Sequence, residues 1–64
     1  MIKVIWQGKE NLIDKERVKI EDLLKEFGIF PEAVIVAKNG EVVTEDEVAE
    51  TGDEIHIIRA ISGG

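Results

Sequence analysis

The sequence contains no cysteine, only one proline, and three aromatic residues among its 64 positions. The absence of cysteine excludes disulfide bonds, thiol nucleophiles and thiolate-ligated iron–sulfur or zinc sites. The longest apolar run covers only residues 33–37, and the amino end lacks the apolar run of a signal peptide. We therefore expect a cytoplasmic protein with no membrane segment, whose fold depends on its apolar core.

Basic residues are missing from one long segment of an already acidic chain. The formal net charge is −6, and seven acids but no base lie between Glu41 and Glu54. Such a field repels phosphate backbones, so nucleic acid is not an expected partner. Two interpretations of the segment stay open: a solvated acidic loop that favours solubility, or a surface that steers the protein toward a basic patch on a protein partner.

Groups that could form a catalytic or metal site are also scarce. His56 is the only histidine, and Ser62 lies too near the chain end to join it in a stable catalytic triad. The acidic segment lacks the spacing of a calcium loop, and no glycine-rich phosphate loop follows a strand. We therefore predict that the protein is not an enzyme and binds no metal or cofactor of its own.

The first half of the chain shows two strand patterns and one helix pattern. Residues 2–7 alternate in polarity as in a half-buried strand, Gly8 favours a turn, and residues 10–17 form the second predicted strand. A helix follows, ended by Gly28 and begun at Lys19, a poor N-cap. Its apolar stripe has the spacing i, i+3, i+4 and i+7 and consists of Ile20, Leu23, Leu24 and Phe27.

The second half predicts another pair of strands and a final one. Residues 33–38 are apolar, and Asn39-Gly40 favours a type I′ hairpin into residues 41–43. Residues 44–51 are predicted as an acidic loop or short helix, and residues 54–60 as the last strand. The order ββαββ predicts an α+β fold in which a mixed sheet of four to five strands packs on one helix, with the last strand beside the first.

Strict alternation also predicts which side chains lie on the face of the sheet away from the helix. If Ile55 and Ile57 face the helix, neighbouring positions of the same strands face outward. Three isoleucines on such an open face would form an apolar patch of the kind that marks a partner surface, unless a loop or a second copy covers it. The outward-facing residues are Ile5, Ile35, His56 and Ile58.

The last residues, Ile61, Ser62, Gly63 and Gly64, directly follow the final predicted strand. A terminal glycine pair arises by chance in roughly one chain in 200 at average glycine usage, so alone it could be a frayed end. Together with the ββαββ order, the Lys38-Asn39-Gly40 hairpin and the run from Gly52 to Gly64, it resembles the ubiquitin-like β-grasp sulfur carriers, most closely the thiamin-biosynthesis type, ThiS. The resemblance covers the whole chain and implies one β-grasp domain, residues 1–64, with a flexible tail at residues 60–64.

The resemblance implies a function for the tail. In that family an adenylating enzyme related to ubiquitin-activating enzymes uses ATP to convert the terminal carboxylate, here that of Gly64, to an acyl-adenylate, and a persulfide then gives a thiocarboxylate. Gly63 and Gly64 carry no side chains, so the tail could enter a narrow channel. Partner contacts are expected from the open-face residues and from Arg59, Ile61 and Ser62.

The destination of the sulfur stays open in the sequence. Formation of the thiamin thiazole by a thiazole synthase is the leading expectation, with a cysteine desulfurase or rhodanese as the sulfur donor. Molybdopterin-type carriers share the terminal pair but are usually longer, and small ubiquitin-like protein modifiers share both the size and the ending. A binding module with an incidental tail is the remaining alternative.

Overall fold

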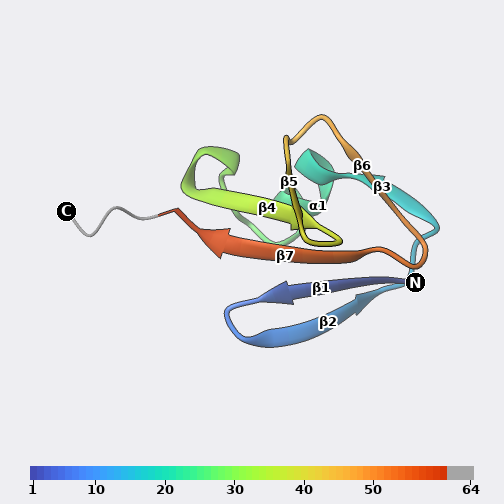
Figure 1. Ribbon diagram of the computed structural model, residues 1–64. Coiled ribbons are helices and arrows are strands. Elements are labelled where there is room, and N and C mark those ends of the chain that lie inside the picture. The colour runs from blue at the N-terminus through green and yellow to red at the C-terminus, as the bar shows by residue number, and fades with distance from the viewer. Residues whose placement is uncertain (61–64) are drawn as a thin grey trace.

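The computed structural model describes residues 1–60, which form a mixed sheet, a short helix and a second, smaller sheet (Figure 1). The five-stranded sheet has the order β2-β1-β7-β4-β5, and a two-stranded sheet pairs β3 with β6. The elements are β1 (Ile2–Trp6), β2 (Lys9–Ile13), β3 (Arg17–Lys19), α1 (Ile20–Glu26), the 3₁₀ helix η1 (Pro31–Ala33), β4 (Val34–Lys38), β5 (Glu41–Val43), β6 (Val48–Glu50) and β7 (Glu54–Arg59).

The last strand lies beside the first, as predicted, and occupies the middle of the large sheet. β7 pairs with β1 in parallel and with β4 in antiparallel orientation, and the remaining neighbours are antiparallel. This mixed sheet packed on one helix confirms the predicted α+β, ubiquitin-like β-grasp architecture. Within residues 1–60, no helix is long and apolar enough to cross a membrane.

The core lies between the helix and one face of the sheet. The predicted helix stripe is confirmed, since Ile20, Leu23 and Leu24 are buried and Phe27 packs against the buried set. The sheet supplies alternate positions of its central strands, in keeping with the period-two pattern. The buried apolar residues are Ile2, Val4, Val18, Ile20, Leu23, Leu24, Val36, Ala49, Ile55 and Ile57.

Backbone groups replace the missing side-chain cap at the start of α1. Lys19 is the N-cap and makes no side-chain capping hydrogen bond. Instead, the Ile20 N–H donates to the Glu47 carbonyl over 2.9 Å, and the Glu21 N–H donates to the Glu45 carbonyl over 3.0 Å. Free N–H groups of a first helical turn are thus satisfied by the acidic segment, which explains how the helix begins behind a poor cap.

The predicted strand boundaries are wrong in two places. The second strand was expected over residues 10–17, but β2 ends at Ile13 and β3 is a separate strand. The stretch expected as a loop or short helix contains β6, which pairs Val18 with Ala49. Each of these strands is three residues long and buries only its central residue, so no alternation was available to identify it. The predicted strand segments therefore omit β3 and β6.

Two tight turns connect neighbouring strands of the large sheet. Asn39 and Gly40 both have positive φ, 53° and 90°, as the predicted type I′ hairpin requires. The turn between β1 and β2 has the same character, with φ of 53° at Gln7 and 76° at Gly8. Positive φ at a glutamine is uncommon and was not predicted.

Candidate functional site

The end of β7 anchors the chain as far as Ala60, the first residue of the predicted tail. Arg59 pairs with Val34 of β4, and the Ala60 N–H donates to the Ala33 carbonyl over 3.0 Å. β7 is the central strand; its residues 55–57 are paired on both sides, and the following two residues are paired with β4. The candidate tail residues Ile61, Ser62, Gly63 and Gly64 lie outside the described residues, so their predicted roles and the flexibility of the tail stay predictions.

The four side chains predicted to share the open face do lie together there. Ile5 pairs with His56 across β1 and β7, and Ile35 pairs with Ile58 across β4 and β7. Ile35 is 43% exposed and Ile58 is 51% exposed, while Ile5 and His56 are partly buried by their neighbours. We call Ile5, Ile35, His56 and Ile58 the open-face cluster; its role in partner binding stays a prediction.

The open face carries further apolar side chains that the sequence analysis did not name. Ala37 pairs with His56 on one side and with Val42 on the other, so one row of side chains continues from Ile5 to the edge strand β5. Val42 is 74% exposed. Only the cross-strand register could place Val42 in this row, because β5 is too short to show alternation.

Charged side chains form a border beside the open-face cluster. Lys3 forms an ion pair of 3.0 Å with Glu10, and His56 Nε2 lies 2.6 Å from a carboxylate oxygen of Glu54. The hydrogen bond from His56, followed by the positive charge of Lys3, lowers the pKa of Glu54. The hydrogen bond and charge of Glu10 raise the pKa of Lys3. Both shifts favour the charged forms, so the border is polar and ionised beside an apolar surface.

A network of hydrogen bonds holds the turn that leads into β7. The Asn39 amide nitrogen donates to the Asp53 carboxylate over 2.9 Å, and the Glu54 N–H donates to the Asn39 side-chain oxygen over 2.9 Å. The second Asp53 oxygen accepts from the Glu50 N–H over 2.8 Å. These bonds, the one from Asn39 first, lower the pKa of Asp53 below its ordinary value.

We expect Asp53→Asn to destabilise the protein by about 1 kcal/mol at neutral pH, because the ionised carboxylate accepts two hydrogen bonds that one amide oxygen cannot replace. Since folding lowers the pKa of Asp53, the contribution of its charge is present above the ordinary Asp pKa and is lost as the pH falls through the lower, folded value. Urea unfolding over this range measures the difference in free energy of unfolding. The difference in free energy of unfolding between wild type and variant should become smaller as the pH falls. A difference that stays constant would show that ionisation of Asp53 does not contribute to stability.

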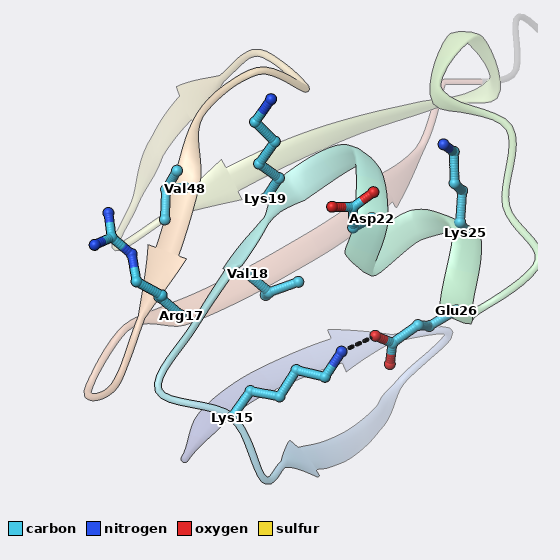
Figure 2. Close-up of a pocket in the computed structure, with 8 residues that line it drawn as sticks. All are labelled: Lys15, Arg17, Val18, Lys19, Asp22, Lys25, Glu26 and Val48. Atoms are coloured by element: carbon cyan, nitrogen blue, oxygen red, sulfur yellow. Dashed lines mark hydrogen bonds and ion pairs between the residues drawn. The ribbon is translucent and has the colours of Figure 1, made fainter.

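A hollow of about 600 Å³ lies on the helix side of the sheet between β3 and α1. Figure 2 shows the Lys15 side chain directed at Glu26, with which it forms an ion pair, while Arg17 points away from them. Arg17 lies 3.7 Å from Glu50, and both side chains are largely exposed. Exposed pairs of this kind are weak, so the hollow has a solvated border rather than the converging buried groups of an active site.

The described part of the chain offers no site for a bound metal ion. Among residues 1–60, no group of three or more His, Cys, Asp or Glu side chains is arranged to hold one. The lone histidine is engaged with Glu54 on the open face. The features that remain as candidates for function are the open face and the end of β7.

Nearly the whole chain matches the model of one protein family. The ThiS family model matches residues 4–64. The chain belongs to the ThiS family. This membership confirms the predicted resemblance to ThiS-type sulfur carriers, and carriers of this family work with adenylating enzymes and sulfur donors.

Individual ThiS-like relatives agree with this assignment. The sulfur carrier protein TtuB of Thermus thermophilus is 41% identical over 46 residues, covering 70% of this chain and 69% of its own length. An uncharacterised protein of Archaeoglobus fulgidus is 39% identical over 59 residues, covering 92% of this chain and 87% of its own length. The crystal structure of the thiamine biosynthesis protein ThiS from Geobacter metallireducens has a TM-score of 0.70 and 25% identity, covering 97% of this chain and 99% of that one.

Proposed function

We propose that the terminal carboxylate of Gly64 is the functional group of this sulfur carrier and that it delivers sulfur for the thiazole of thiamin. A carboxylate oxygen attacks the α-phosphorus of ATP in an adenylating enzyme and releases pyrophosphate. A persulfide sulfur then attacks the acyl carbon and displaces AMP. The product is an acyl disulfide that joins Gly64 to the donor. A second thiol of the donor attacks the donor's sulfur in this S–S bond, which leaves a disulfide on the donor and a thiocarboxylate on Gly64. The ThiS-family match, which extends through the Gly-Gly pair, carries this proposal.

The position of β7 supports a role in presenting the tail. The strand is paired on both sides, and the backbone stays hydrogen-bonded as far as Ala60. From Ala60, the five residues to Gly64 span at most about 17 Å when extended. A partner that acts on Gly64 therefore has to approach the end of β7 closely. The absence of cysteine fits a carrier whose sulfur arrives from another protein.

Delivery to an acceptor other than thiazole synthase is the second candidate. The Thermus relative, 41% identical, is named a sulfur carrier with no reference to thiamin, whereas the Geobacter ThiS structure is only 25% identical. The residues proposed to carry sulfur are the same in both cases, so the acceptor enzyme makes the difference.

Reconstitution with purified partners tests the proposal. The carrier is incubated with MgATP, an adenylating enzyme and a cysteine desulfurase or rhodanese, and then with thiazole synthase and its other substrates. We expect pyrophosphate release that depends on the carrier, a thiocarboxylate, and consumption of that thiocarboxylate as thiazole forms. A thiocarboxylate that forms but is not consumed would exclude the thiazole role and favour another acceptor. No adenylation of Gly64 would contradict the proposal as a whole.

The open-face cluster provides a separate prediction about binding of the adenylating enzyme. We expect Ile58→Asp and Ile35→Asp to weaken binding about tenfold or more, because each places a charge in an apolar contact. The domain should remain folded, since both side chains are about half exposed. Binding by calorimetry and a circular dichroism melt measure the two effects separately.

Val42→Asp is the matched control, because Val42 lies on the same face but at the edge strand β5 and is 74% exposed. It should change binding much less than the two isoleucine variants. Unfolding of Ile58→Asp and Ile35→Asp would show that these side chains belong to the core. Folded variants with full affinity would place the contact surface elsewhere.

A further inference from the structure

An aromatic side chain stands exposed in the connection between α1 and β4. Phe30 is 73% exposed, although it is one of only three aromatic residues in the sequence. A hollow of about 200 Å³ lies on one side of it, lined also by Trp6, Val34 and Arg59. A second hollow, of about 380 Å³, is also lined by Phe30 and includes Lys25 and Pro31.

The local backbone explains why Phe30 points outward. At the end of α1, Gly28 has a φ of 72°, its N–H donates to Lys25, and the Ile29 N–H donates to the Leu24 carbonyl over 2.9 Å. This Schellman motif turns Ile29 back against the core. The next residue is extended, with φ −80° and ψ 129°, as the following proline favours. Phe30 therefore lies between the Schellman motif and η1, and this backbone path leaves its side chain exposed.

This connection lies at the end of the sheet where β7 ends (Figure 1). The Ala60 N–H donates to the Ala33 carbonyl of η1, and Arg59 pairs with Val34 directly after η1. A partner that reaches Gly64 along a tail of at most about 17 Å comes close to this surface. Phe30 thus stands where a tail-binding partner has to approach.

The charged side chains that line the two hollows beside Phe30 are both basic, opposite in sign to the net charge of the chain. Arg59 lines the smaller hollow and Lys25 the larger one, in a protein of net charge −6. Within residues 1–60, neither side chain belongs to an ion pair. A partner surface with an apolar pocket and carboxylates at its border complements this arrangement.

We propose that Phe30, with Ile29, Pro31, Lys25 and Arg59, forms a second docking surface, the tail-root ridge, which inserts into an acid-bordered apolar pocket of the adenylating enzyme. This inference rests on the proposed function. Alternation along β7 places Ile58 on the open face, whereas the ridge is built on the helix-side connection. The enzyme then contacts both sides of the end of β7, which fixes the direction in which the tail enters its active site.

Steady-state kinetics of the adenylating enzyme test the ridge. Carrier-dependent pyrophosphate release is measured with MgATP for wild type, Phe30→Ala, Phe30→Leu and Lys25→Glu. We expect Phe30→Ala to raise the KM for the carrier about tenfold with little change in kcat, Phe30→Leu to recover part of the loss, and Lys25→Glu to raise the KM most at low salt. Circular dichroism melts should stay close to wild type for the Phe30 variants, because the side chain is exposed.

Leu12→Ala is the matched control, since Leu12 is 62% exposed on the edge strand β2 and pairs with Lys3 at the end of the open face where β7 begins, away from Phe30 and Ile58. The KM of the adenylating enzyme for the Leu12→Ala carrier should equal its KM for the wild-type carrier. If wild type is adenylated but the KM for Phe30→Ala is unchanged, the ridge does not bind the enzyme and the proposed function still holds. The same conclusion follows if Leu12→Ala raises the KM as much as Phe30→Ala does. A wild type that is not adenylated at all would overturn the proposed function and this inference with it.

Discussion

Removal of Gly64 is expected to abolish adenylation and thiocarboxylate formation while the fold and its melting temperature stay unchanged. The shortened chain still has a terminal carboxylate, but that group lies about 3.3–3.6 Å closer to the body of the protein. Misplacement of a reacting group by even about 1 Å can cost about 100-fold in rate. Pyrophosphate release and intact mass after incubation with MgATP, adenylating enzyme and sulfur donor measure the loss.

Addition of one alanine after Gly64 is the matched variant, because it keeps every native residue and moves the carboxylate outward instead of inward. It should be equally inactive unless a protease removes the added residue, which intact mass would reveal. A chain lacking Gly64 that still accepted sulfur would contradict the assignment of the functional group.

Leu24→Ala is expected to lower the free energy of unfolding by about 2–5 kcal/mol, because it leaves a cavity where the helix packs on the sheet. Leu24 is 1% exposed and belongs to the buried set that includes Ile55 and Ile57. Native domains are stable by only about 5–15 kcal/mol, and a domain of this size lies toward the lower end, so the change would remove much of the total.

Urea unfolding followed by circular dichroism measures this effect, with Leu12→Ala as the comparison. Leu12 is the same residue type but 62% exposed, so its truncation should change the free energy of unfolding by no more than about 0.5 kcal/mol. Equal midpoints for Leu24→Ala and wild type would show that the buried face of α1 has been assigned incorrectly.

Long periodic patterns and specific turn residues made most of the fold predictable. The stripe in α1 identified the buried helix face, and Asn39-Gly40 identified a hairpin that the structure confirms. β3 and β6 were missed because each is three residues long and buries one side chain, Val18 or Ala49. Their pairing depends on contacts between distant segments, which local patterns do not contain.

The candidate site was predictable to different degrees. Alternation along β1, β4 and β7 placed the open-face cluster correctly, because its members lie on strands long enough to show the pattern. The extension through Ala37 to Val42 required the register between β4 and β5. Phe30 follows no periodic pattern, and its exposure depends on the end of α1 and on η1 packing beside Arg59. Its only signal in the sequence was an aromatic residue between a helix-ending glycine and a proline.

The intact mass of the protein isolated from its native cells shows whether its terminal carboxylate carries sulfur. We expect a fraction of chains in which one sulfur replaces one oxygen, with fragmentation placing the change at the Gly64 carboxylate. Chains found only with an unmodified carboxylate, or joined through Gly64 to lysines of other proteins with no thiocarboxylate present, would contradict the role of a sulfur carrier.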